Sequence, residues 1–420
     1  MKPWLKSILL FTLLTPRIFA QDEIFEMEEV VARYDGENET ELSTTTSTRY
    51  IPMDKSSKNL DLAEVIARQP AVKNQKYGAQ GSFSTVSIRG TDGKRVAVFV
   101  DGVLQNSAVG GAVDLSAYSG LDIKGIKVYR GVVPAELGGN SLGGAINIIT
   151  NSGGEDRASI SLLTGSFGEF RGVGSLSHNL SDKVNLFGSI DYHRATNDYP
   201  YWDRNGTPYN PDDDTLRTLN NNKYVSGVGS LGSNFYLKNN RKIRIEWAHS
   251  DKTLGIPGGE WGKNETAQYS SRDDRFTLDY RRSFESKNSY GQGLTYSVVA
   301  DETFWTYLDH YGVAHGILGP KSVGRLSSKD YFLNYNLLNE LFLGKHFSLN
   351  SRMDISGEQL IPQSDVDGYV MGHWEVRRFS PKLASDFTTT FGGLSATLGG
   401  SVGWDFNHTM AGLMTILGIP

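Results

Sequence analysis

Four aspartates stand close together in one polar stretch, DRNGTPYNPDDD, at positions Asp203, Asp212, Asp213 and Asp214. Carboxylate oxygens are the ligands that Ca²⁺ prefers, so this stretch is a candidate calcium site. Its spacing is not that of an EF-hand loop, and acidic residues are common in solvated loops. The sequence therefore offers calcium as a candidate ligand, with a solvated acidic loop as the favoured alternative.

The other candidates for chemistry are weaker. His310 and His315 lie in or beside a predicted outer loop and are candidate ligands of a metal or haem, although two surface histidines usually bind nothing. Asp191 and His193 share a face of a predicted strand, but a hydrolytic site needs further acid and base groups that converge on them. The run GGNSLGG lacks the Gly-Lys-Ser/Thr ending of a phosphate-binding loop. We expect no enzyme, and no cofactor apart from the candidate calcium.

The elements that position the chain are clearest between residues 82 and 151. The runs SFSTVSIRG, RVAVFVDG and IKGIKVYRG each end in Arg-Gly or Asp-Gly, and ELGGNSLGGAINIITN follows them. Short β-type runs closed by such pairs predict a small, tightly turned sheet, in which glycines permit a positive φ. The motif residues are Arg89, Gly90, Asp101, Gly102, Arg130, Gly131, Gly143 and Gly144.

These four runs, with LDLAEVIARQPAV upstream, closely resemble the plug domain of TonB-dependent outer-membrane receptors. The resemblance implies a 22-stranded barrel whose lumen is closed by the plug, in the outer membrane of a Gram-negative bacterium. It implies energised uptake of a scarce large ligand, of which a ferric siderophore is the commonest type. Cobalamin, another metal chelate or a glycan are alternatives, as is a binding receptor without transport. A passive pore would need neither a plug nor the segment described next.

The N-terminal residues resemble a secretory signal, with Lys2 and Lys6 before the apolar run Ile8 to Leu14, so residues 1–20 are a predicted signal peptide. Residues 21–42 are a predicted flexible segment, because Asp22 to Glu41 holds nine acidic residues and one basic residue. Within it, EEVVA resembles the TonB box, which would bind TonB by β-addition. The box residues are Glu28, Glu29, Val30, Val31 and Ala32.

Residues 43–153 are the predicted plug domain. Leu42 to Ser57 is expected to be a linker, and a short helix is expected to begin at an Asn59 cap and end at Pro70. The resemblance implies that two plug loops meet the ligand, and that Arg89 and Arg130 form ion pairs with glutamates of the barrel wall that break during transport. A purely structural pair is the alternative. The ligand-facing residues of these loops are Tyr77, Gln80, Phe83, Gln105, Asn106 and Tyr118.

From residue 154 to residue 420 the sequence has a period of two. Leu186, Ile190 and Tyr192 alternate with Asp191 and His193, for example. In a membrane barrel the apolar face of such strands meets lipid and the charges line the lumen, whereas a soluble sandwich turns charges to water. Short turns alternate with long polar connections at 195–222, 250–270, 309–325 and 357–373, which favours the barrel.

Composition agrees with this assignment. The mean hydropathy is −0.36, which excludes a helical membrane bundle but not a barrel. The net charge of −5 gives no reason to expect a nucleic-acid partner, and we expect a monomer in outer-membrane lipid. The predicted fold is mainly β: a small α+β plug followed by an incomplete antiparallel transmembrane barrel of about eleven strands, half of the family's 22. The sequence thus predicts a fragment, a truncated reading frame or an incomplete domain.

Overall fold

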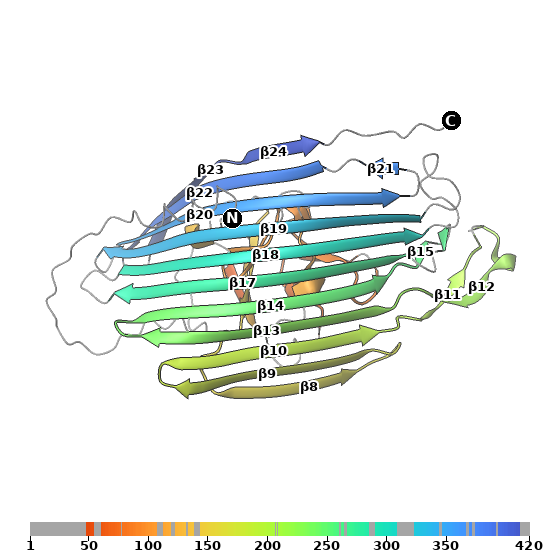
Figure 1. Cartoon of the computed structure of the whole chain (residues 1–420), viewed down its shortest axis with the longest axis horizontal. Coiled ribbons are helices and arrows are strands. Elements are labelled where there is room, and N and C mark those ends of the chain that lie inside the picture. The colour runs from red at the N-terminus through yellow and green to blue at the C-terminus, as the bar shows by residue number, and fades with distance from the viewer. Residues whose placement is uncertain are drawn as a thin grey trace. The chain divides into compact units, whose positions relative to one another are not determined.

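The computed structural model of the chain is dominated by β-strands (Figure 1). Among the described residues, no helix is both long enough and apolar enough to span a bilayer. The described residues are 48–53, 60–76, 78–106, 112–118, 122–131, 133–137, 143–205, 207, 209–259, 262–263, 267–284, 290–308, 323–343, 347–366, 369–371, 374–391 and 394–411.

A five-stranded sheet, which we call the small sheet, forms near the N-terminus in the order β1-β6-β7-β4-β5. The strands β4 and β7 are parallel, and the other neighbours are antiparallel. Beside it, β2 and β3 pair as a separate two-stranded sheet. The strands are β1 (Thr48–Pro52), β2 (Val72–Lys76), β3 (Ser84–Ile88), β4 (Ala97–Val100), β5 (Val103–Leu104), β6 (Ile123–Tyr129) and β7 (Ala145–Thr150).

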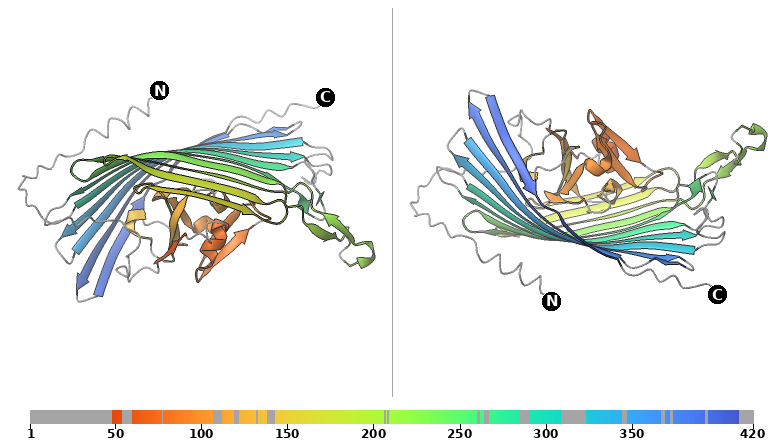
Figure 2. Two further views of the ribbon diagram at one scale, coloured as in Figure 1. Left: turned by 90° about the horizontal axis from the view of Figure 1, so that it is seen from below. Right: turned by 90° about the horizontal axis from the view of Figure 1, so that it is seen from above.

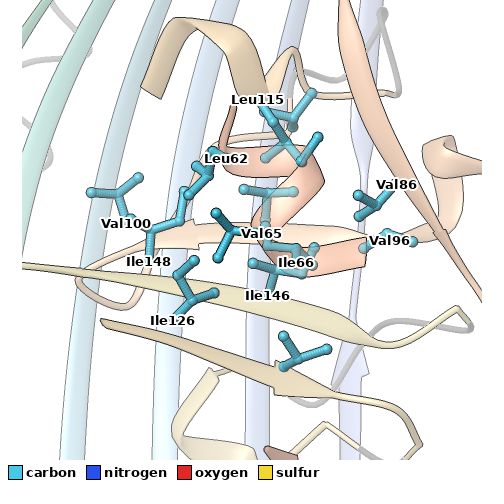
Figure 3. Packing of buried hydrophobic residues seen from close by; sticks show 14 of the residues in the cluster. Leu62, Val65, Ile66, Val86, Val96, Val100, Leu115, Ile126, Ile146 and Ile148 are labelled. Atoms are coloured by element: carbon cyan, nitrogen blue, oxygen red, sulfur yellow. The ribbon is translucent and has the colours of Figure 1, made fainter. Parts of the chain in front are cut away.

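The helix α2 (Leu62–Ala67) supplies one side of the core of the small sheet (Figure 3). Its apolar residues Leu62, Val65 and Ile66 are at most 1% exposed and pack with strand residues such as Ile126 and Ile148. Full burial of one such side chain contributes roughly 1.5–3 kcal/mol. Helix and strands therefore share one continuous core, which explains why so short a helix is stable.

Two Xaa-Gly turns adopt the conformation that the glycines were predicted to allow. Arg89 and Gly90 have φ values of 53° and 76°, and Asp101 and Gly102 have 50° and 81°. Two consecutive residues with positive φ match the right-handed twist of a hairpin, and Asp-Gly is a favoured pair for this turn. Asp101 and Gly102 accordingly join β4 to β5 through the Val100 and Val103 pair.

Three predictions for this region were wrong in detail. Thr48–Pro52 is not linker but β1, because it pairs with β6 and the Tyr50 ring covers the bare backbone of Gly125. The cap of α2 is Asp61, whose side chain accepts a hydrogen bond from the Ala63 N–H; Asn59 lies outside the described residues. The run around Val86 pairs with β2 rather than joining the small sheet.

A 13-stranded antiparallel sheet, which we call the large sheet, follows the small one (Figure 1). Eleven strands form its path in sequence order, and β21 and β24 pair beside them with β20 and β22. The described strands thus agree with the eleven predicted for half of a 22-stranded barrel. They are β8 (Arg157–Thr164), β9 (Phe170–Ser181), β10 (Val184–Ala195), β13 (Tyr224–Leu237), β14 (Arg241–Gly255), β17 (Gln268–Phe284), β18 (Tyr290–Leu308), β19 (Val323–Leu343), β20 (Phe347–Val366), β21 (Tyr369–Met371), β22 (Trp374–Phe391), β23 (Leu394–Gly403) and β24 (Phe406–Ala411).

The two faces of the large sheet differ as a membrane barrel requires. On β8, Ile160 and Leu162 are 85% and 71% exposed. On β10, Ile190 is 67% exposed, whereas its neighbours Asp191 and His193 are 2% and 6% exposed. Apolar side chains therefore cover one face and charged side chains are buried on the other, which is the arrangement predicted for a lipid-facing wall and not that of a soluble sandwich.

Several predicted long connections contain strands. Residues 250–255 and 268–270 belong to β14 and β17, and residues 357–366 belong to β20. The connection after β10 includes a hairpin of β11 (Pro200–Asp203) with β12 (Thr215–Thr218) and a 3₁₀ helix, Pro211–Asp213. The polar composition of these residues indicated loops. They form strands because their backbone hydrogen bonds to the neighbouring strand do not depend on the side chains.

Candidate functional site

The small sheet and α2 lie against one face of the large sheet, and we call the large sheet the wall (Figure 2). This is the face on which charged side chains such as Asp191 are buried. Several side chains of the wall reach the small sheet and its loops through hydrogen bonds and ion pairs. We divide these contacts by their height along the wall. One rim carries the short turns at residues 182–183 and 238–240, and the other carries the long connection at 196–223.

One contact near the short-turn rim is centred on Asp101. Arg244 of β14 places Nη2 2.9 Å from Asp101 Oδ2, and both side chains are largely buried, at 7% and 13% exposure. The same carboxylate accepts hydrogen bonds from the N–H and the hydroxyl of Thr150, at 2.9 and 2.6 Å. Arg244 also lies 3.3 Å from Glu246. The turn between β4 and β5 is thus tied both to β7 and to the wall.

Asp101 belongs to the small sheet, and its protonation is set by this environment. Burial by itself raises the pKa of the carboxyl. The Arg244 guanidinium and the two hydrogen bonds from Thr150 outweigh burial, so the pKa lies below its ordinary value of 3.8. The ion pair is therefore present at neutral pH.

The same turn has a second contact with the wall. Arg352 of β20 donates a hydrogen bond of 3.0 Å to the carbonyl of Gly102, while its guanidinium pairs with Asp354 at 2.7 Å. Gly102 is also bound within the small sheet, where its N–H donates to Asn147. Arg244 and Arg352 hold adjacent residues of one two-residue turn, and we call these two contacts the lower clamp.

Nearer the long-connection rim, Lys252 of β14 makes the corresponding contact. Its Nζ lies 2.9 Å from Asp114 Oδ2 and 2.5 Å from the Ser116 hydroxyl. The other oxygen of Asp114 accepts hydrogen bonds from the N–H groups of Ser84 and Ser116, both at 3.0 Å. Asp114 therefore joins β3, the 3₁₀ helix Leu115–Tyr118 and the wall, and we call the Lys252 contacts the upper clamp.

At the same rim, the loop 78–82 rests on the wall. Asn197 donates a hydrogen bond of 3.3 Å to the carbonyl of Gln80. A Cβ added at Gly81 would lie 2.1 Å from the ring of Tyr224, the first residue of β13. A backbone that approaches a ring so closely requires glycine.

Behind Tyr224, β9 and β10 carry a buried polar cluster. Arg171 and Asp191 form an ion pair of 2.8 Å, and both side chains are at most 5% exposed. His193 Nε2 lies 3.2 Å from Glu169 Oε1, and its ring contacts Tyr224 edge to face at a centroid distance of 5.2 Å. Because each charged group has a partner, these side chains can be buried as part of the structure.

The plug-motif residues have different surroundings in the structure. The pairs Arg89-Gly90 and Asp101-Gly102 form turns, and Gly144 has a φ of 107° with its Cα against the Tyr129 carbonyl. Gly143 packs against the backbone of Arg95. Gly131 follows β6 without a positive φ.

The ion pairs predicted for Arg89 and Arg130 differ from those described. Arg89 is exposed at its turn, and Arg130 donates to the carbonyl of Pro70. In the three described ion pairs between the wall and the small sheet with its loops, Arg244–Asp101, Lys252–Asp114 and Arg157–Asp122, the bases belong to the wall. Whether Arg89 and Arg130 form ion pairs with glutamates of the wall stays a prediction.

The predicted ligand-facing residues have several roles. The Asn106 side chain bonds to the backbone of Val96 and Val98 in place of a further strand residue. Gln105 accepts a hydrogen bond of 3.3 Å from the Tyr118 hydroxyl, so the two ends of one predicted loop meet. Phe83 is 37% exposed, and Gln80 contacts the wall through its carbonyl. Whether these residues meet a ligand stays a prediction.

The acidic stretch is spread over the β11–β12 connection. Asp203 is fully buried and pairs with Arg217 at 3.0 Å. Asp212 and Asp213 lie in the 3₁₀ helix, Asp213 accepts a hydrogen bond from Thr207, and Asp214 ends the helix. In the part of the chain that the structure describes, no group of three or more acidic or histidine residues is placed to hold a metal. The calcium site stays an untested prediction.

Several predicted features fall outside the described residues. They are the signal peptide, the TonB-box residues Glu28 to Ala32, Tyr77, and the histidines His310 and His315. Conversely, sequence reasoning did not single out Arg244, Lys252 or Arg352. A signal was present, because each occupies a polar position of a period-two strand, but the pattern does not name the partner.

The chain resembles a known protein family and several solved structures. Residues 40–145 match the family model described as the TonB-dependent Receptor Plug Domain. Three solved structures share the fold. The FpvAI–pyocin S2 complex has a TM-score of 0.60 at 13% identity, covering 88% of this chain and 52% of that one. The copper transporter OprC has a TM-score of 0.59 at 13% identity, covering 84% of this chain and 58% of that one. The closed form of the ferric-catecholate import receptor Fiu of E. coli has a TM-score of 0.55 at 13% identity, covering 88% of this chain and 63% of that one.

Together these findings define the class of protein. Residues 40–145 are a TonB-dependent receptor plug domain, and the chain has the fold of a plug followed by part of a receptor barrel. The small sheet with α2 is hence the plug. The chain spans between half and two thirds of the length of the structures it resembles.

Proposed function

We propose that the protein is an outer-membrane receptor for TonB-dependent uptake of a large metal chelate, with a ferric siderophore as the first ligand to test. The observation that carries the proposal is a plug held against the polar face of a wall whose other face is apolar. A plug bound by ion pairs and hydrogen bonds can move as a unit, because its apolar core is internal and need not be exposed. The protein itself would perform no covalent chemistry.

Two structural neighbours support a metal-chelate ligand. One neighbour is a ferric-catecholate import receptor and another is a copper transporter. A chelate with a metal other than iron is therefore the second candidate, ahead of cobalamin or a glycan.

In this proposal, TonB binds the segment Glu28 to Ala32 by β-addition and transmits force to the plug through the chain that leads into β1. Force applied there favours a plug conformation in which the ligand is held less tightly. The upper clamp and the loop 78–82 lie at the rim proposed to face the outside, and the lower clamp lies toward the periplasm.

Deletion of residues 28–32 tests the proposal. Cells that express the chain are given radiolabelled iron bound to catecholate or hydroxamate siderophores, and binding at low temperature is measured separately from energised uptake. We expect binding to persist and uptake to fall to the level of cells without the protein. As a control, a deletion of the same length at residues 36–40 should leave both intact. Unchanged uptake after the first deletion would indicate a receptor without transport, and no binding to any chelate would reject the ligand class.

A further inference from the structure

Loop 78–82 of the plug makes a close contact with the wall. Gly81 lies against the ring of Tyr224 at a distance that leaves no room for a side chain, and its φ is 79°. The carbonyl groups on either side of its Cα are also bound: that of Gln80 by Asn197 at 3.3 Å, and that of Gly81 by the Ser116 hydroxyl at 3.5 Å. Three neighbours thus determine the position of two consecutive residues.

The wall residues at this contact are themselves held firmly. Tyr224 is 4% exposed, and its hydroxyl lies 2.7 Å from that of Ser226. The edge-to-face contact with His193 supports the ring from behind, and Glu169 binds the far nitrogen of that histidine. Such aromatic contacts contribute about 0.5–1.5 kcal/mol beyond burial. The ring therefore has one position, and the loop must conform to it.

Asn197 is equally constrained. Its side-chain amide donates to the carbonyl of Asn222 at 3.0 Å, and the side chain of Asn222 donates in return to the Asn197 carbonyl at 3.2 Å. This reciprocal pair joins the two ends of the long connection between β10 and β13. The asparagine that binds Gln80 is consequently fixed relative to Tyr224.

We infer that Tyr224 and Asn197 are positioning residues of the receptor: they fix plug loop 78–82 and thereby set where Gln80 and the following Phe83 are presented to a ligand. We call Tyr224, Asn197 and their supports His193 and Asn222 the loop seat. The inference depends on the proposed function for the ligand, but the seat itself is a property of the plug and the wall, and it is tested without any ligand.

The absence of cysteine from the sequence allows a direct measurement. Gln80→Cys carries the single thiol, and a nitroxide attached there reports the mobility of the loop by electron paramagnetic resonance. Asn197 binds the main-chain carbonyl of Gln80, so the label leaves that bond in place. In the otherwise unchanged chain in outer-membrane vesicles, we expect an immobilised spectrum.

Substitution of Tyr224 separates positioning from folding. Tyr224→Ala should convert most of the immobilised component to a mobile one, whereas Tyr224→Phe keeps the ring and should retain it. Gly81→Ala should also mobilise the label, because its methyl group would enter the ring. Gly90→Ala is its matched control, since Gly90 has a similar φ of 76° and nothing within 4 Å of the added carbon.

Two results support the inference and two overturn it. Mobilisation by Tyr224→Ala and Gly81→Ala, with retention in Tyr224→Phe and Gly90→Ala, supports it. A double variant, Gly81→Ala with Tyr224→Ala, that is no more mobile than Tyr224→Ala alone supports it further, because both substitutions disrupt the same contact. An immobilised label in Tyr224→Ala shows that the seat does not fix the loop. Equal mobilisation by Gly81→Ala and Gly90→Ala attributes the effect to backbone strain. Failure of chelate binding in the unsubstituted chain would reject the proposed function and leave these spectra unaffected.

Discussion

Replacing Asp101 by asparagine tests the lower clamp with the smallest possible change. Asparagine has the shape of aspartate and tolerates the positive φ of 50° at this position, so the turn itself is preserved. The change removes the negative charge that faces Arg244 and Thr150. The arginine retains Glu246 at 3.3 Å, so its own charge is not left entirely unpaired.

The magnitude follows from these contacts. Removing one partner of a buried pair costs about 3–5 kcal/mol, and the remaining Glu246 contact places the loss near the lower end, at about 3 kcal/mol. Since 1.4 kcal/mol is a factor of ten, the population of plug molecules with this turn opened should rise by about a hundredfold. The amide protons of Asp101 and Gly102, which are bonded to Ile148 and Asn147, report that opening.

Hydrogen–deuterium exchange measured by mass spectrometry is the assay. The peptide that covers β4 and β5 should lose about two orders of magnitude of protection in Asp101→Asn, and the peptide that covers α2 should lose much less. Asp92→Asn is the control, because Asp92 is an exposed acid of the plug that only caps a 3₁₀ turn. Unchanged protection of the β4–β5 peptide would refute the reasoning, since the turn would then be held by the plug alone.

Three further predictions follow from described contacts. The pKa of Asp101 is lower in the folded protein than its ordinary value of 3.8, so the lower clamp stabilises the plug above pH 3.8 and is lost as the pH falls through the pKa of the folded protein. Protection factors of the β4–β5 peptide should therefore drop in acid in the unsubstituted protein, and the Asp101→Asn variant should not show this drop. Lys252→Met removes the upper clamp and should lower protection of Leu115–Tyr118 by about 1–3 kcal/mol, whereas Lys238→Met at a turn should change nothing. Gly144→Ala should lower the melting temperature of the protein more than Gly90→Ala does. Both substitutions introduce backbone strain of roughly 1–2 kcal/mol, but the methyl group at position 144 would also lie 2.4 Å from the Tyr129 carbonyl oxygen. Equal melting temperatures of the two variants would contradict this.

Local signals in the sequence were sufficient for the elements and the faces of this fold. Asp101-Gly102 was recognised as a turn because few other pairs accept two positive φ values in succession. The burial of Asp191 and the exposure of Ile190 follow from a period of two, once the apolar face is assigned to lipid. Both features depend on a few neighbouring residues.

Pairing between distant residues could not be predicted in the same way. Asp101 and Arg244 are 143 positions apart, and period-two alternation states only that Arg244 faces inward. The identity of its partner depends on the height at which the plug rests against the wall. For the same reason Thr48–Pro52, polar and short, was assigned to a linker, although its pairing with β6 makes it a strand.

Arg244 and Lys252 belong to the same strand, and this has a mechanical consequence. They are eight residues apart on β14, or about 26 Å at about 3.3 Å per residue. Between them β14 is hydrogen-bonded on both sides, to β13 and to β17, so this length cannot change without breaking two ladders. The strand therefore keeps the two contacts with the plug at a fixed separation. Tension that enters the plug at one end must lengthen the plug itself or break one contact before the other, which makes the order in which the contacts break a measurable property of the molecule.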